Sequence, residues 1–293
     1  MKNLSDFIRR FLFEHAPIRG EIVRLDAVWK SVMERHEYPP VLRNMMGELC
    51  AAAVLLAATL KLKGAMVLQI HGKGAVKLLV VECSGDLELR ATAKWEGELS
   101  HGTLQDLIGD GRFVITLDPK DGNQAYQGIV ALEGDSIAEI LQNYMTRSEQ
   151  LDTHLWLAAD GQCASGMLLQ RLPERGETSD ADAWPRAIQL AETIKPDELQ
   201  NLPAEELLHR LYHEEDIRLF DEQAVIFHCT CSRDNVASML RMIGRAEVDA
   251  LLAERGNIEV FCEFCNERYE FDHVDAEAVF ADSMAAPANK TLH

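Results

Sequence analysis

Four cysteines near the C-terminal end have the spacing of metal-binding or redox-active residues. Cys229 and Cys231 lie in HCTCSRDN, and after 30 intervening residues Cys262 and Cys265 follow in VFCEFCNERY. Tetrahedral zinc sites are commonly closed by four cysteines in two close pairs, although C-x-C is a less usual half-site than C-x-x-C. A zinc-bound thiolate is also the form that oxidants attack. The spacing therefore predicts a four-cysteine zinc site, and it permits a redox switch without requiring one.

The compartment that we expect for this chain is the cytoplasm. The N-terminal segment MKNLSDFIRRFLFEHAP contains Asp6 and Arg9 within its apolar pattern and has no small-residue cleavage site, unlike a signal peptide. The longest apolar run, Leu49 to Leu60, is too short to cross a bilayer and predicts a buried helix. Cytosolic thiols are kept reduced, and paired cysteines there more often bind metal or do redox work than form permanent disulfides.

The cysteines lie in a predicted zinc-binding unit at residues 227–274. Its sequence predicts two helices separated at Gly244, followed by a hairpin with the second cysteine pair in its turn. So small a unit cannot rely on apolar burial alone, whereas a structural zinc site supplies roughly 10–16 kcal/mol. Two simpler readings remain open, namely ordinary reduced thiols and a purely structural zinc knob. His228 and His273 flank the unit, but with four cysteines available we do not expect them to be ligands.

An acidic linker is predicted at residues 174–226. Residues 174–222 contain 14 Asp or Glu against 5 Lys or Arg. Two short helices are expected within it, with Pro185 and Pro203 near their first positions. Helices of about ten residues are marginal alone, so these need a surface to pack on. Their detachment would expose apolar side chains that bind unfolded chains. The residues that we expect to contact such clients are Ala187, Leu190, Ile194, Leu207, Leu208 and Leu211.

The remaining sequence predicts an α+β core at residues 1–173 and a flexible tail at 275–293. Strand-like and helix-like segments come in blocks rather than in strict alternation, which favours antiparallel sheets with helices. A long helix is expected up to a C-cap at Gly64, and a hairpin turn at 71–74. The whole chain is therefore predicted to have an antiparallel core with helices, a helical linker and a small four-cysteine zinc domain.

Composition argues against several classes of function. The net charge of −19 disfavours nucleic acid and anionic membranes as partners. Neither a phosphate-binding loop nor a nucleophile signature such as G-x-S-x-G occurs, so we do not expect an enzyme. Cys50 and Cys83 lie in apolar stretches and are expected in the core. Cys163 follows a turn and is expected to be more exposed, without an evident role.

The motifs CTCSRDNV and IEVFCEFCNERYEFD resemble the paired motifs of the heat shock protein 33 family, the redox-regulated cytosolic chaperones. The resemblance extends over essentially the whole chain and includes RLDAVWKSVMERHEYPP, GELCAAAVLLAATLK and GRFVITLDPKDGNQAYQGIV. One departure is Asn235, where a basic residue is expected. It is not a ligand, so the metal assignment is unaffected, but the lost charge could alter the thiol pKa values.

The resemblance implies a mechanism and specific partners. All four cysteines would hold one Zn²⁺ in a reduced, inactive state. Peroxide or hypochlorite, helped by heat, would form the disulfides Cys229–Cys231 and Cys262–Cys265 and release the zinc. The zinc unit and linker would then unfold, and the protein would bind unfolding clients without ATP, as a holdase that dimerises on activation. Residues 1–173 would be the substrate-binding and dimerisation domain.

Two alternatives belong to other classes of protein. One is an enzyme or adaptor whose C-terminal zinc knob is purely structural, and the other is a zinc-ribbon nucleic-acid binder. Reversible gain of function on oxidation distinguishes the redox switch from the knob, because zinc loss from a knob only damages an existing activity. Binding that falls steeply with salt would favour the zinc ribbon, although the net charge argues against it.

Overall fold

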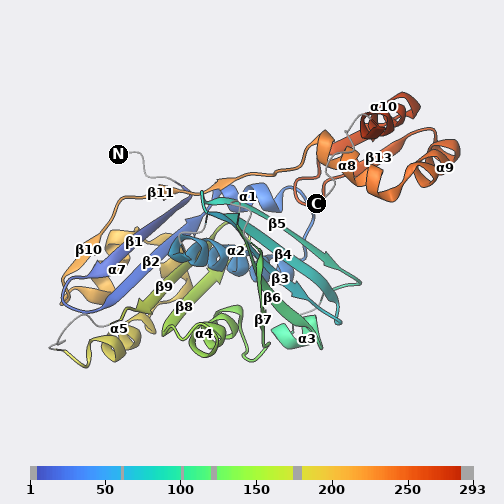
Figure 1. Ribbon diagram of the computed structural model, residues 1–293. Helices are drawn as coiled ribbons and strands as arrows, with labels where there is room; N and C mark the ends of the chain where they lie inside the picture. Colours follow the sequence, from blue (N-terminus) through green and yellow to red (C-terminus); the bar gives the residue numbers. More distant parts are fainter. Residues whose placement is uncertain (1–4, 61–62, 100–101, 120–123, 174–179, 285–293) are drawn as a thin grey trace, which may run out of the picture. The chain divides into compact units, whose positions relative to one another are not determined.

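The structure is a computed structural model with two compact units, Met1–His228 and Cys229–His293 (Figure 1). It describes most of the chain, namely residues 5–60, 63–99, 102–119, 124–173 and 180–284. The fold class is α+β, as the sequence predicts, with a four-cysteine cluster near the C-terminal end. The functional division at residues 173 and 226 stays a prediction.

Two β-sheets form the framework of the first unit (Figure 1). The first sheet has the order β10-β1-β2-β9-β8, with β11 also paired to β1, and the second has the order β12-β5-β4-β3-β6-β7. Neighbouring strands are antiparallel except for β12, which is parallel to β5. The first sheet consists of β1 (Phe7–Phe13), β2 (Ile18–Leu25), β8 (Thr153–Ala159), β9 (Ala164–Arg171), β10 (Ile217–Leu219) and β11 (Gln223–Ala224). The second consists of β3 (Gly64–His71), β4 (Val76–Ser84), β5 (Glu88–Trp95), β6 (Arg112–Pro119), β7 (Tyr126–Val130) and β12 (Ile226–Phe227).

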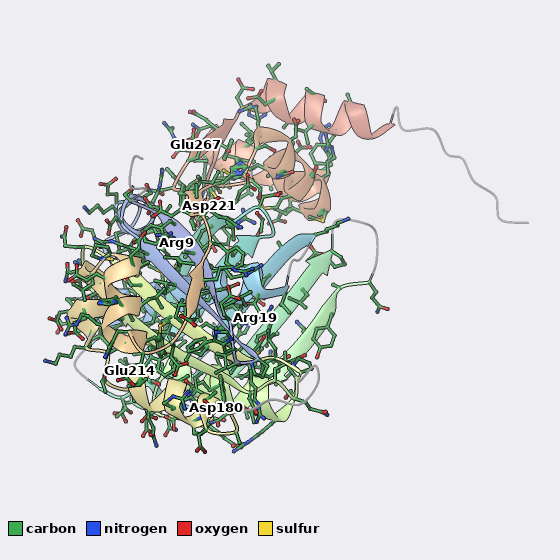
Figure 2. The ribbon with its side chains drawn as sticks, turned by 90° about the vertical axis from the view of Figure 1, so that its left-hand side faces the viewer. Arg9, Arg19, Asp180, Glu214, Asp221 and Glu267 are labelled. Atoms are coloured by element: carbon green, nitrogen blue, oxygen red, sulfur yellow. The ribbon has the colours of Figure 1, made fainter. Side chains whose placement is uncertain are left out.

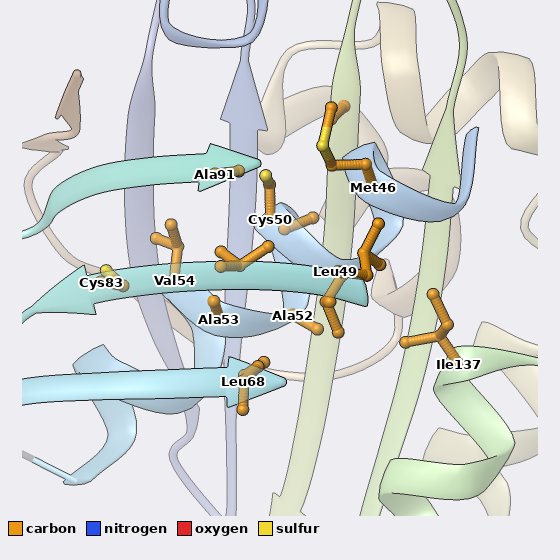
Figure 3. Packing of buried hydrophobic residues seen from close by; sticks show 14 of the residues in the cluster. Met46, Leu49, Cys50, Ala52, Ala53, Val54, Leu68, Cys83, Ala91 and Ile137 are labelled. Atoms are coloured by element: carbon orange, nitrogen blue, oxygen red, sulfur yellow. The ribbon is translucent and has the colours of Figure 1, made fainter. Parts of the chain in front are cut away.

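Helix α2 (Pro40–Leu60) lies between the two sheets and contacts strands of both. Its sequence is apolar on all sides, which suits a helix with a sheet on each face. Figure 3 shows side chains of α2 such as Leu49 and Val54 packed among these strands. By length and composition α2 could cross a membrane, but 72% of its apolar window is buried inside the protein, as expected of a core helix. Three further helices belong to the core: α1 (Ala27–Met33), α3 (Leu104–Ile108) and α4 (Ile137–Arg147).

Cys50 and Cys83 are buried in this core, as predicted (Figure 3). Burial raises the pKa of Cys83 to about 12 and the pKa of Cys50 above its usual range. Both are therefore protonated at neutral pH, and a thiol reacts far more slowly than a thiolate. The expectation that Cys163 is exposed is wrong. It is buried near the carbonyl of Gln200, with its Sγ 3.1 Å from the Oγ of Ser165.

Three linker helices cover the face of the first sheet that is turned away from α2. They are α5 (Ala183–Ala191), α6 (Pro196–Asn201) and α7 (Ala204–Tyr212). The sequence predicts α5 and α7. It does not predict α6, a helix of 6 residues that is too short to show an apolar periodicity. The helices and the sheet form one apolar cluster in which Phe11, Met167 and Tyr212 are buried. The Oη of Tyr212 donates to the carbonyl of Ala187 at 3.1 Å, which links α7 to α5.

The chain leaves α7 as an extended segment, residues 216–228, which we call the strap. It contributes β10 and β11 to the edge of the first sheet and β12 to the edge of the second. The sequence predicts no strands in this segment, which spans the end of the predicted linker and the first two residues of the predicted zinc-binding unit. Its last residue, His228, directly precedes Cys229.

The second unit contains three helices and one hairpin among its described residues. Helices α8 (Arg233–Ile243) and α9 (Arg245–Arg255) are separated at Gly244, as predicted, and Gly244 has a φ of +100° that favours glycine. Strands β13 (Ile258–Phe261) and β14 (Arg268–Phe271) form the predicted hairpin. Helix α10 (His273–Met284) extends through residues that the sequence analysis assigned to the tail, and 285–293 lie outside the described residues.

Gly64 differs from its predicted role as a helix C-cap. It is the first residue of β3, opposite Pro119 of β6. A Cβ at this position would lie 2.1 Å from the carbonyl oxygen of Asp118, so close strand approach explains the glycine.

Glu48 of α2 generates a prediction about pH. Burial raises the pKa of its carboxyl group to about 7, from an ordinary value of 4.5. The folded state therefore holds a proton that the unfolded state releases near pH 4.5, so stability is lost as pH rises from 4.5 through 7. We expect Glu48→Gln to raise the free energy of unfolding at pH 8 by up to about 3 kcal/mol and to change it little at pH 4.5.

Denaturant unfolding under reducing conditions, followed by tryptophan fluorescence, measures this difference. Every tryptophan of the chain lies in residues 1–228, so the signal reports the first unit. An equal change in stability at both pH values would contradict the assignment.

Candidate metal centre

The C-x-C pair lies in the short connection between β12 and α8. Ser232 caps α8, because its Oγ accepts a hydrogen bond from the backbone N–H of Asn235 at 3.2 Å. The side-chain amide of Asn235 donates to the carbonyl of Thr230 at 2.9 Å. Asn235 therefore fixes the residue between Cys229 and Cys231. This gives a structural role to the one position that departs from the expected motif.

The C-x-x-C pair occupies the turn of the β13–β14 hairpin. The backbone N–H of Cys262 donates to the carbonyl of Glu267 at 2.9 Å, and that of Asn266 donates to the carbonyl of Cys262 at 2.8 Å. Asn266 has a φ of +58°, a left-handed conformation that asparagine tolerates better than most residues. The tight turn holds Cys262 and Cys265 close together.

The four sulfur atoms converge in one cluster. All lie within 4.8 Å of one another, with Cys229 to Cys262 at 3.6 Å and Cys231 to Cys265 at 3.3 Å. Tetrahedral zinc with Zn–S bonds of about 2.3 Å requires sulfurs roughly 3.8 Å apart, so the four positions fit such an ion. Both of these sulfur–sulfur contacts join one motif to the other. The cluster therefore links the start of the second unit to its hairpin.

The electrostatics of the cluster favour occupation by a cation. Cys265 is buried, and burial raises the pKa of its thiol above the ordinary value. Its three neighbouring sulfurs raise this pKa further. Crowded thiolates repel one another unless a positive charge compensates them, and metal ligation requires deprotonated sulfur. Four thiols at this spacing are therefore suited to a divalent soft or borderline metal ion.

Tyr269 is a site residue that the sequence analysis missed. Its hydroxyl donates to the Sγ of Cys231 at 3.2 Å from strand β14. The hydrogen bond raises the pKa of Tyr269, because the hydroxyl keeps its proton while it donates. Such donors outside the ligand set orient a ligand and stabilise its charged form. The only signal in the sequence is an aromatic residue four positions after Cys265.

Little apolar burial supports the second unit apart from this cluster. Its core comprises eight buried residues, all small or medium-sized except Phe271. Met242 and Val274 are exposed. The guanidinium of Arg233 lies 4.2 Å from the ring centre of Phe271 and donates to the carbonyl of Glu270. The sulfur cluster is therefore one of the links between the two ends of the unit, together with this contact of Arg233.

The other predicted site residues are located as follows. His228 lies outside the cluster and has its Nδ1 3.0 Å from a carboxylate oxygen of Glu88, and His273 begins α10. The six predicted client-contact residues all belong to the apolar cluster beneath the linker helices. Four are buried (Ala187, Leu207, Leu208 and Leu211) and two are partly buried (Leu190 and Ile194). Their contact with clients stays a prediction.

Fold and site together define an α+β protein with a C-terminal four-thiol unit. The family model described as "Hsp33 protein" matches residues 6–272, and the chain belongs to this family. It is 55% identical to a 33 kDa chaperonin of Methylobacillus flagellatus and 51% identical to one of Chromobacterium violaceum, with 99% of each chain covered in both cases. Family membership supports a chaperone role.

A solved structure agrees with this fold. The crystal structure of a 33 kDa chaperonin from Thermotoga maritima matches with a TM-score of 0.81 at 20% sequence identity. The match covers 96% of this chain and 99% of that one. At this identity the likeness concerns the fold.

Tyr269→Phe tests the hydroxyl at the metal centre. Removal of the hydrogen bond to Cys231 should weaken zinc retention about tenfold while leaving four ligands in place. Zinc transfer from the reduced protein to a chromogenic chelator measures it. Tyr126→Phe, the same change at an exposed tyrosine of the first unit, should leave retention unchanged. Equal retention in Tyr269→Phe and the unmodified protein would contradict the role of the hydroxyl.

Proposed function

We propose that this protein is a redox-regulated, ATP-independent holdase of the cytoplasm that protects unfolding proteins from aggregation under oxidative and heat stress. When reduced, it would hold one Zn²⁺ on Cys229, Cys231, Cys262 and Cys265 and be inactive. Oxidation would activate it. The observation that carries this proposal is the convergence of these four sulfurs within 4.8 Å, in a unit with little other core.

The redox step is a two-electron oxidation of each close cysteine pair. Bound zinc would supply the positive charge that keeps all four sulfurs as thiolates. Two thiolates of one pair lose two electrons and form an S–S bond, while one peroxide takes up these electrons with two protons and becomes two water molecules. We propose the pairs Cys229–Cys231 and Cys262–Cys265. A sulfur in a disulfide no longer offers a thiolate, so metal affinity is lost.

Loss of the metal would unfold the second unit and then release the linker. Without zinc the unit lacks the binding energy that small metal-dependent domains require. The strap is covalently continuous with Cys229, and it connects to α7 at its other end. The linker helices are short and depend on the sheet for their apolar contacts. We therefore infer that 174–226 is a metastable linker and 227–274 the redox switch.

The client surface would be the apolar interface that the linker covers. On the linker side it comprises Ala187, Leu190, Ile194, Leu207, Leu208 and Leu211, and on the sheet side it includes Phe11 and Met167. Large exposed apolar surface binds unfolded chains, and the net charge of −19 would keep the open state soluble. We place client binding and dimerisation on activation in residues 1–173. The acidic charge supports a protein without nucleic-acid or membrane partners.

The direct test measures zinc, thiols and chaperone activity in the same samples. Peroxide at raised temperature should release one zinc with the loss of four thiols, and peptide mapping should find the two proposed disulfides. The oxidised protein alone should suppress aggregation of a chemically unfolded client. Reductant with zinc should restore the inactive state. Zinc retained through oxidation, or equal suppression in both states, would instead favour a purely structural zinc knob.

Leu211→Ala tests the linker as the element that keeps the protein inactive. Leu211 is buried against the sheet, and truncation of a buried leucine costs about 2–5 kcal/mol. We expect the reduced, zinc-bound variant to suppress aggregation partially, because the linker detaches without oxidation. Leu60→Ala makes the same change at a side chain that is 44% exposed and should stay inactive when reduced. An inactive reduced Leu211→Ala protein with a detached linker, seen by hydrogen exchange, would contradict the proposal.

A further inference from the structure

The strap, residues 216–228, pairs with the edges of both sheets in the first unit. Its strands β10 and β11 pair with β1, and β12 pairs with β5. Apart from the strap, β1 is paired only with β2 and β5 only with β4 among the described strands. Removal of the strap would therefore expose one unpaired edge on each sheet. Unpaired strand edges readily accept another extended chain.

Main-chain hydrogen bonds hold the strap along these edges. On the first sheet, the N–H of Phe220 donates to the carbonyl of Arg10 at 2.9 Å and the N–H of Val225 donates to that of Asp6 at 3.2 Å. On the second sheet, Ile226 donates to Leu87 at 3.1 Å and His228 donates to Leu89 at 3.1 Å. Recognition through the main chain is largely independent of sequence.

Alternate side chains of the strap add apolar contacts. Ile217 and Leu219 pack against the cluster beneath the linker helices, and Val225 and Phe227 pack against the central core. The side chains of Phe220 and Ile226 are 38% and 49% exposed, although their N–H groups pair with the sheets. The edges thus accept an extended segment with apolar residues at every second position in two short stretches.

Arg9 of β1 contacts the strap and α7 together. Its Nε donates to the carbonyl of Phe220 at 3.1 Å, and its guanidinium lies 3.8 Å from Glu222 and pairs with Glu205. Figure 2 shows Arg9 beside the strap at Asp221. Departure of the strap and α7 would leave this cation free to bond a carbonyl or carboxylate of an incoming chain.

We propose that the edges of β1 and β5, once the strap has left them, bind an extended segment of an unfolded client by β-strand addition. In the reduced protein the strap occupies both edges in place of a client segment. This inference rests on the proposed function and defines how the open state recognises its clients. Main-chain pairing suits a protein that binds many sequences, because every unfolded chain except at proline offers the same N–H and C=O groups.

A peptide carrying residues 216–228 tests the proposal on the oxidised full-length protein. Fluorescence anisotropy of the labelled peptide measures direct binding. Competition with reduced, carboxymethylated lactalbumin, a permanently unfolded protein, measures whether peptide and client share a site. We expect the peptide to bind the oxidised protein, not the reduced one, and to displace lactalbumin.

Two peptide variants separate main-chain pairing from apolar contact. A peptide with Phe220→Pro and Ile226→Pro lacks two N–H donors to the sheets, and one with Phe220→Ala and Ile226→Ala keeps them. The proline peptide should compete at least about tenfold more weakly than the alanine peptide. Equal competition by both would overturn strand addition. If none of the peptides reduces lactalbumin binding, this inference alone is overturned. If the oxidised protein does not bind lactalbumin at all, the proposed function is overturned as well.

Discussion

The contact between four sulfur atoms is the interaction on which the rest of the proposed mechanism depends. It joins the two ends of a unit whose core is too small to fold firmly by apolar burial. Each sulfur of the C-x-C motif contacts a sulfur of the C-x-x-C motif, with Cys229 3.6 Å from Cys262 and Cys231 3.3 Å from Cys265. Disulfides within each motif would therefore replace contacts that hold the unit closed with links that do not, even though no cysteine is lost.

The strap and the linker helices connect the four-sulfur cluster to the sheet edges and to the apolar sheet face of the first unit. The strap follows the edges of both sheets and ends one residue before Cys229, and the linker helices cover an apolar sheet face just upstream. The central helix α2 lies on the other side of that sheet and is buried between both sheets. The linker helices, in contrast, are short and make their apolar contacts on the outer face of the first sheet.

The sequence predicted the elements with strong local patterns and missed those that depend on distant contacts. The break at Gly244, the cysteine hairpin and the helices α5 and α7 followed from periodicity and turn residues. The strap was not predicted, because its short strands are fixed by pairing with β1 and β5. The burial of Cys163 and the hydroxyl of Tyr269 at Cys231 were missed for the same reason. Both arise from segments that meet only in the folded chain.

Hydrogen–deuterium exchange of the full-length protein, before and after oxidation, tests the central claim most directly. The account predicts that amides in residues 183–228 lose protection together with the second unit, whereas those in α2, β3 and β9 keep it. The amides of Phe220 and Ile226 should be among those that open, because they bond to the sheet edges. Loss of protection confined to residues after Cys229, with the strap and linker helices unchanged, would contradict it.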